Sequence, residues 1–92
     1  MDENEKNKTK KQINRYYNET MKTKEPYSGK AISNIFELSK IAVENKNKNR
    51  KISNQALKQL QKIFLKHDSE GTRREAFRAF DHAKHGKIYA WD

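Results

Sequence analysis

SNQALKQLQKIFLKH, residues 53–67, is predicted to form an amphipathic helix with one apolar face and one basic face. Its apolar positions recur at helical spacing and are Ala56, Leu57, Leu60, Ile63 and Phe64. Lys58, Lys62 and Lys66 recur every four residues, so they line a second, exposed stripe of the same helix. The hydroxyl of Ser53 is placed to cap its N-terminus. We therefore expect this helix to pack against others on one side and to face solvent on the other.

The chain before residue 53 is expected to hold two further helices. Residues 1–12 are polar and charged, and we expect a disordered basic arm because they cannot bury enough apolar surface to become ordered. Residues 13–25 carry a narrow apolar stripe, which predicts a weak amphipathic helix that forms only by docking. Residues 31–43 have a broad apolar face, and Ser28 or Ser33 is placed to cap that helix.

The last part of the chain predicts one more helix. The sequence TRRE, residues 72–75, fits the capping box, in which the first and last residues satisfy each other's backbone amide. Gly86 is placed to end this helix. The residues expected to point inward are Phe77, Phe80 and Ala83, with Ala76 as a further candidate. We therefore expect an all-α fold in which residues 28–92 form a compact helical domain. Three core helices make up this bundle, with a fourth helix at the N-terminus and a short aromatic tail at the C-terminus.

Length and composition restrict the classes of function. The chain has 92 residues, of which 33% are hydrophobic and 36% charged, so its core is small and a deep, dry active site is hard to build. It has no cysteine, which excludes a disulfide framework and thiolate metal sites. No apolar run is long enough to span a membrane, and no signal-peptide core follows Met1, so we expect a cytoplasmic protein.

Positive charge is concentrated in one part of the chain. The formal net charge is +9, and lysine supplies 16 of the 21 basic residues. Lysine, asparagine and isoleucine have AT-rich codons, so an AT-rich genome explains part of this bias. It does not explain why the stretch from Asn45 to His67 has no acid and seven basic residues: Lys46, Lys48, Arg50, Lys51, Lys58, Lys62 and Lys66. A surface of one sign attracts polyanions, which indicates nucleic acid or a nucleoprotein complex as the partner.

The helices expected at residues 53–67 and 72–85 resemble a helix-turn-helix arrangement, in which the second helix enters the major groove by its N-terminal half. Arginine pairs bidentately with phosphate and with guanine. The N-terminal half of the second helix holds three of the five arginines in the chain: Arg73, Arg74 and Arg78. The expected turn, residues 67–71, is long for a DNA-reading module, so a plain helical hairpin with solvated charges stays open as an alternative.

Other candidate sites are weaker. The chain shows no nucleophile-elbow, phosphate-loop or paired-carboxylate pattern, so we predict that it is not an enzyme and uses no cofactor. His67, His82 and His85 are expected to be surface histidines near helix ends, because two neighbouring histidines are too few ligands for a metal site. Tyr89 and Trp91 are large amphipathic aromatics, so the tail is the candidate surface for a protein partner, unless it covers the end of the core.

Three functions stay open from the sequence. The first is a nucleic-acid-binding or nucleoprotein-binding accessory protein of a phage or other mobile element from an AT-rich host. The second is an inhibitor of a host defence nuclease, since the chain is similar in size and lack of motifs to small phage inhibitors such as anti-CRISPR proteins. The third is a bacteriocin immunity protein, a family that is similar in being small, often basic, four-helical and ending in an aromatic tail, as residues 88–91 do here.

Overall fold

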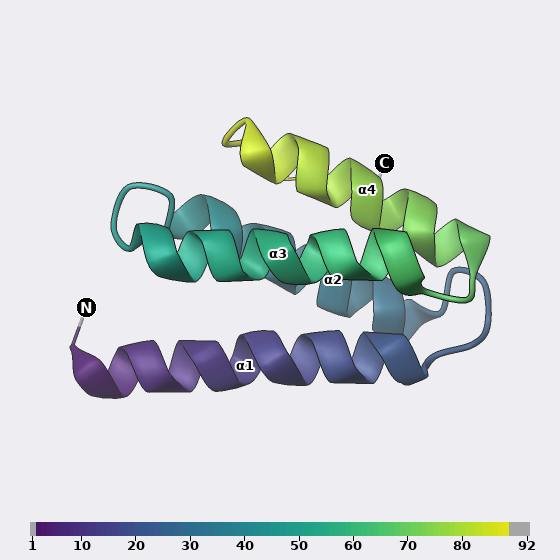
Figure 1. Cartoon of the computed structure of the whole chain (residues 1–92), viewed down its shortest axis with the longest axis horizontal. Coiled ribbons are helices and arrows are strands. Elements are labelled where there is room, and N and C mark those ends of the chain that lie inside the picture. The colour runs from purple at the N-terminus through teal and green to yellow at the C-terminus, as the bar shows by residue number, and fades with distance from the viewer. Residues whose placement is uncertain (1, 89–92) are drawn as a thin grey trace.

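The computed structural model describes residues 2–88, which contain four helices and no strand. The helices are α1 (Glu3–Lys22), α2 (Gly29–Glu44), α3 (Arg50–Lys66) and α4 (Glu70–Lys84). Successive helices run antiparallel, so the N-terminus of α1, the α2–α3 loop and the C-terminus of α4 share one end of the bundle (Figure 1). The predicted all-α bundle is confirmed, and the N-terminal helix is its fourth member.

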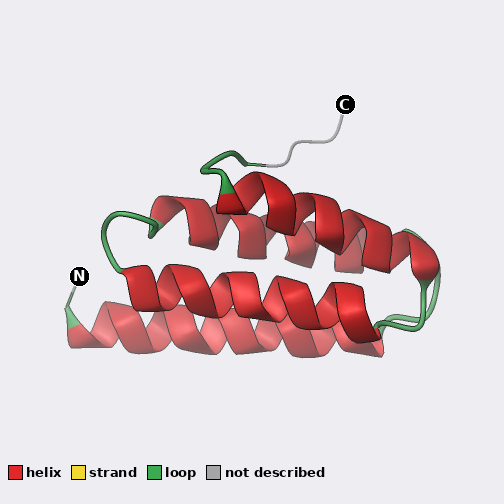
Figure 2. Ribbon diagram, turned by 45° about the horizontal axis from the view of Figure 1, so that its top comes forward, coloured by secondary structure: helices red, strands yellow, loops and turns green. Residues whose placement is uncertain are grey.

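Helices α2 and α3 form the centre of the bundle. They pack on each other, and both α1 and α4 pack on the two of them, whereas α1 and α4 are not neighbours. Figure 2 shows this order, with the N-terminal helix at the bottom and the C-terminal helix at the top. The fully buried core takes side chains from all four helices, and its largest members are Ile13, Ile35, Leu38, Ile52, Leu60 and Ile63. Helix α3 therefore has α1 as a third neighbour besides α2 and α4.

Helix α1 begins at Glu3, within the segment that was expected to be a disordered arm. Asp2 caps it by accepting a hydrogen bond of 2.9 Å from the amide of Glu5. The two acids in its first turn, Glu3 and Glu5, suit the positive end of the helix dipole. Ile13 is completely buried, so docking fixes the middle of the helix. Once a helix is nucleated, each further residue adds a hydrogen bond at little cost, and this extends α1 through the polar segment.

Helix α3 begins earlier than the sequence predicted. Its cap is Asn49, whose side chain accepts from the amide of Ile52 at 3.2 Å. Ser53, the predicted cap, lies inside the helix, and its hydroxyl donates a buried hydrogen bond of 2.6 Å to the carbonyl of Ala42 in α2. Ser28 occupies the cap position of α2, although its side chain makes no capping hydrogen bond.

Helix α4 is capped by Ser69 and not by Thr72. The amide of Thr72 donates to the hydroxyl of Ser69 at 3.3 Å, so Thr72 belongs to the first turn and is buried. The predicted end at Gly86 is confirmed, because this residue has a φ of 79° and follows the last turn. The amides of Gly86 and Lys87 donate to carbonyls three and five residues earlier, as in a Schellman motif.

Alanines and not phenylalanines form the inner face of α4. Ala83 is buried as predicted, together with Ala76 and Ala79, while Phe77 is 53% exposed and Phe80 is half-buried. The small side chains allow α4 to lie close to α2 and α3. The two phenylalanines are placed at the α3–α4 seam, where both make edge-to-face contacts with Phe64, with ring centroids 5.4 and 5.3 Å apart.

Candidate nucleic-acid interface

The lysines of α3 lie on the side of that helix that borders α1. Lys58, Lys62 and Lys66 are about one turn apart and form one stripe. The ammonium of Lys62 lies 5.8 Å from the centroid of the Tyr17 ring of α1, which is within the range of a cation–π contact. Lys62 is half-buried at this seam, and Lys58 and Lys66 on either side of it are exposed. Lys62 therefore lies at the α1–α3 seam, and the stripe continues from it along the exposed side of α3.

A hollow adjoins the stripe at the end of the bundle where α1 begins. It has a volume of about 450 Å³ and is lined by Asn49 and four cations: Lys6, Lys48, Arg50 and Lys51. Lys6 belongs to α1, and the other three cations belong to the α2–α3 loop and the first turn of α3. Lys51 lies two helical turns before Lys58, on the same side of α3, so the hollow continues into the stripe. The fold thus joins a cation of the N-terminal segment to the basic run in the middle of the chain.

Within residues 2–88, no carboxylate lies within the 4.0 Å of an ion pair from any cation of the hollow or the stripe. Carboxylates that do form ion pairs include Glu19, Glu70 and Asp81, and their partners lie on α1, α2 and α4 and at the C-cap of α4. We call the hollow and the stripe together the α3 basic face: Lys6, Lys48, Arg50, Lys51, Lys58, Lys62 and Lys66. Its charges repel one another, and an anionic ligand would compensate them.

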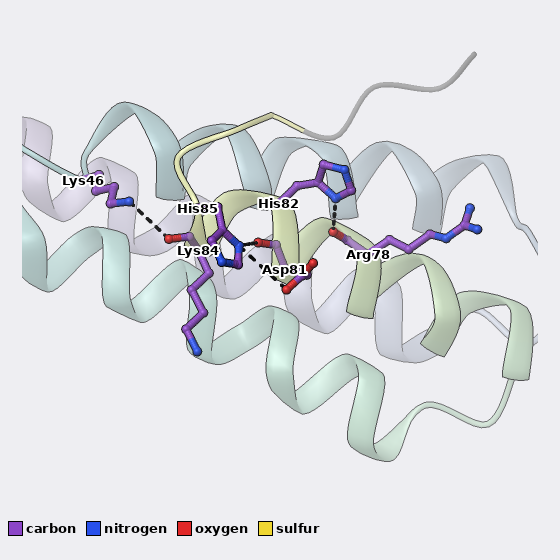
Figure 3. A network of polar contacts seen from close by, with 6 residues as sticks. All are labelled: Lys46, Arg78, Asp81, His82, Lys84 and His85. Atoms are coloured by element: carbon purple, nitrogen blue, oxygen red, sulfur yellow. Dashed lines mark hydrogen bonds and ion pairs between the residues drawn. The ribbon is translucent and has the colours of Figure 1, made fainter.

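Lys46, which also belongs to the predicted basic run, has a partner within the fold. Figure 3 shows its side chain reaching from the α2–α3 loop to the last turn of α4, where the ammonium donates a hydrogen bond of 3.2 Å to the carbonyl of Lys84. The last four carbonyls of a helix have no partner within it, so this contact satisfies one of them. Lys46 therefore helps to cap the C-terminal end of α4 and is not a member of the α3 basic face.

The three arginines of α4 lie away from the hollow. Arg73 donates to the carbonyls of residues 67 and 68 just beyond the end of α3. Arg74 forms an ion pair of 3.4 Å with Glu70, one turn earlier on the same helix. Arg78 is exposed, and its carbonyl accepts a hydrogen bond of 2.8 Å from a histidine of the last turn (Figure 3). Two of these arginines thus make contacts that stabilise the start of α4.

Helices α3 and α4 pack along their whole length. Arg50 in the first turn of α3 and Lys84 in the last turn of α4 line one groove, and Phe64 and Phe77 meet nearer the other end. A helix-turn-helix module instead sets its two helices at about 90–120°. The pair is therefore an antiparallel hairpin, in which the N-terminal half of α4 lies beside the end of α3 and does not project as a reading helix (Figure 1).

His67 is buried, contrary to the expectation of a surface histidine. Only 2% of it is exposed, and it lies where α1, α3 and α4 meet. Its Nε2 is 2.9 Å from the carbonyl of Thr20 in α1, and its Nδ1 accepts a hydrogen bond of 2.9 Å from the amide of Ser69. In the sequence, His67 stands two residues before Ser69, the cap of α4, and this spacing is the signal that could have indicated a hydrogen bond from the Ser69 amide to the His67 ring. His67 is a structural residue at the end of the bundle opposite to the hollow.

The remaining candidates add no second site. Tyr89 and Trp91, the predicted protein-partner residues, lie outside the residues that the structure describes. His82 and His85 donate through Nδ1 to carbonyls four residues earlier, as Figure 3 shows. In the described part of the chain, no group of three or more histidines and carboxylates could hold a metal ion. None of the four helices has the length and apolar character required to cross a membrane.

Comparison of the chain with protein-family models, with curated proteins and with solved structures gives no match. Its function must therefore be inferred from its own residues.

Proposed function

We propose that the protein binds the phosphate backbone of nucleic acid through the α3 basic face. The observation that carries this proposal is that seven cations from α1, the α2–α3 loop and α3 form one surface with no acidic partner among residues 2–88. A surface of one sign concentrates polyanions near it and speeds their association. Released counterions then supply most of the binding free energy, as in other sequence-independent complexes.

The residue types favour contact with phosphates over the reading of bases. Six of the seven cations are lysines, and Arg50 is the single arginine. A lysine ammonium is a compact point charge, whereas bidentate recognition of guanine requires the planar guanidinium of arginine. Contacts to phosphate fix the position of a protein on its ligand but carry no sequence information. We infer an accessory protein that binds nucleic acid without sequence preference and without chemistry on it.

The setting proposed for this function rests on composition. A small, lysine-rich, asparagine-rich chain fits an accessory protein of a phage or other mobile element from an AT-rich host. The ligand would then be nucleic acid, or a nucleoprotein complex, in the cytoplasm.

Fluorescence anisotropy of labelled single-stranded and double-stranded DNA and RNA, titrated with the protein over a salt series, tests the proposal. We expect a Kd of about 1–100 μM at physiological salt, with log Kd rising steeply with log salt. Neutralising the stripe in the variant K58Q/K62Q/K66Q should weaken binding and reduce the salt dependence. Binding that is absent at low salt, or unchanged when salt is raised several-fold, would overturn the proposal. A stable complex with a nuclease, formed without affinity for naked nucleic acid, would favour the inhibitor hypothesis instead.

A further inference from the structure

The hollow between α1 and the α2–α3 loop holds the densest cluster of cations on the α3 basic face. Its four cations come from two segments that are far apart in the sequence, one around Lys6 and one comprising residues 48–51. They meet because α1 and α3 begin at the same end of the bundle (Figure 1). The fold therefore fixes the backbone positions from which these cations reach the hollow.

This cluster is unfavourable for the free protein. Four like charges around one hollow repel each other, and none of them forms an ion pair within 4.0 Å with a carboxylate among residues 2–88. A bundle that needed only to fold would be more stable with a glutamate at one of these positions. Arrangements that lower stability in this way are typical of sites that bind a ligand of opposite charge.

We propose that this hollow binds a phosphate group of the nucleic-acid backbone and anchors the strand on the α3 basic face. The inference rests on the proposed function and adds a defined site to it. Phosphate suits the donors present, because the guanidinium of Arg50 can bind two of its oxygens while the lysine ammonium groups neutralise its charge. The amides of Arg50 and Lys51 belong to the first turn of α3, where the positive end of the helix dipole adds to the same attraction.

The position of the hollow indicates a phosphate within a strand and not a free anion. Lys51 lines the hollow, and Lys58, Lys62 and Lys66 continue from it along the same side of α3. The distance along the helix from Lys51 to Lys66 is about 22 Å at 1.5 Å per residue. A strand anchored at the hollow can therefore place several further phosphates against the stripe.

Two variants with the same change of charge test the site. K6Q/K48Q/K51Q removes three cations of the hollow. The matched control K22Q/K24Q/K40Q removes three exposed lysines outside the α3 basic face, close in sequence to Glu19, Glu25, Glu37 and Glu44. Each variant lowers the formal net charge from +9 to +6. A difference between them therefore reports the hollow and not the overall charge.

We expect the hollow variant to bind labelled DNA at least about tenfold more weakly at low salt, and its slope of log K against log salt to fall by about 2–3. The control should lose less than about threefold, because long-range charge contributes less than direct contacts. Inorganic tripolyphosphate should compete with labelled DNA on the wild-type protein. It should raise the melting temperature of the wild type more than that of the hollow variant, since only a ligand bound to the folded state stabilises it.

The possible results distinguish a failure of the hollow as a phosphate site from a failure of the proposed nucleic-acid binding. Equal losses in the two variants would overturn the hollow as an anchor, and the stripe variant K58Q/K62Q/K66Q would then show whether the rest of the α3 basic face binds nucleic acid. Absence of wild-type binding at low salt would overturn both. Circular dichroism at 222 nm shows whether each variant is folded. If substitution of Lys6 unfolds the N-terminal helix, the double variant K48Q/K51Q, which leaves α1 unchanged, is compared with K24Q/K40Q, and each of these lowers the formal net charge from +9 to +7.

Discussion

Replacement of His67 by alanine is expected to destabilise the bundle strongly, because one buried imidazole links three helices. The amide of Ser69, the cap of α4, donates to Nδ1, so this nitrogen carries no proton. Nε2 then carries the ring proton and donates to the carbonyl of Thr20 in α1 at 2.9 Å, with the hydroxyl of Thr23 at 3.2 Å. His67 itself is the C-cap of α3. A single side chain thus links the end of α1 to the end of α3 and to the cap of α4.

The magnitude follows from which groups lose a partner. In His67→Ala the buried amide of Ser69 loses its acceptor, which costs about 1–3 kcal/mol. The carbonyl of Thr20 keeps the amide and hydroxyl of Thr23 as donors, so it adds little. The vacated imidazole volume adds about 1 kcal/mol as a cavity. The free energy of unfolding should therefore fall by about 2–4 kcal/mol, which corresponds to roughly 8–30 °C in Tm for a domain of this size.

Urea denaturation followed by circular dichroism at 222 nm measures this change, and two further variants identify its cause. In His67→Asn the side-chain oxygen can accept from the amide two residues on, as in an Asx turn, and so replaces Nδ1. In His67→Gln the amide nitrogen can replace Nε2, but the acceptor for Ser69 is lost. We expect asparagine to retain more stability than glutamine or alanine. A loss below about 0.5 kcal/mol in His67→Ala, or an asparagine variant as unstable as alanine, would refute the reasoning.

Three further predictions concern α3 and its loops. Ser53→Ala should lower the free energy of unfolding by about 1–2 kcal/mol in urea denaturation, because the carbonyl of Ala42 loses a buried donor; an unchanged midpoint would contradict this. Lys46→Met should leave nucleic-acid affinity within about twofold in anisotropy titrations, whereas Lys48→Met should weaken it more, since only Lys48 lines the hollow. Gln55→Glu places an acid on the α3 stripe, so it should raise the melting temperature slightly and weaken nucleic-acid binding. A melting temperature and an affinity that both rise, or both fall, would count against the proposed face.

Periodicity predicted the inner faces of the central helices correctly, but it misplaced the inner face of α4. Ala56, Leu60 and Ile63 in α3 are buried, and Leu57 is partly buried, because their broad stripe leaves one way to pack. In α4 the larger apolar residues, Phe77 and Phe80, lie to one side of the stripe formed by Ala76, Ala79 and Ala83. Hydrophobicity alone favours phenylalanine as the inward residue. The rotation of α4 is set instead by how closely α2 and α3 approach it, which no local pattern reports.

The positions of the helix caps likewise depend on both the local sequence and the packing of neighbouring helices. Asn49 and Ser53 both fit the start of α3, and Ser69 and Thr72 both fit the start of α4. In each pair the earlier residue is the cap, and the later one lies inside the helix and is buried. Ser53 lies inside α3 and does not cap it, and its hydroxyl donates a hydrogen bond to a carbonyl near the end of α2. The sequence therefore predicts that a helix starts in each region, but the partner helix determines which residue caps it.

The sequence predicts the candidate site only in part, because the packing of the helices determines which cations lie together. The absence of acids from α3 is visible in the sequence, and it predicts a basic helix surface wherever that helix lies. Which chain ends meet in the bundle determines that Lys6 joins the α3 basic face, that Lys46 donates to a carbonyl of α4, and that Arg73 donates to carbonyls just beyond α3. These assignments need tertiary structure, because identical side chains have different roles according to what lies within hydrogen-bond distance.

The distribution of acids gives the strongest argument that the α3 basic face is more than a result of composition. An AT-rich genome would raise the number of lysines throughout the chain, and some would then lie near carboxylates by chance. Lys30 does so, 3.2 Å from Glu19, and Arg74 lies 3.4 Å from Glu70. A glutamate one turn from a lysine stabilises a helix by about 0.2–0.5 kcal/mol, so acids on α3 would be favourable for folding alone. Their absence from a helix with four lysines and one arginine is therefore better explained by the proposed anionic ligand at this face than by folding alone.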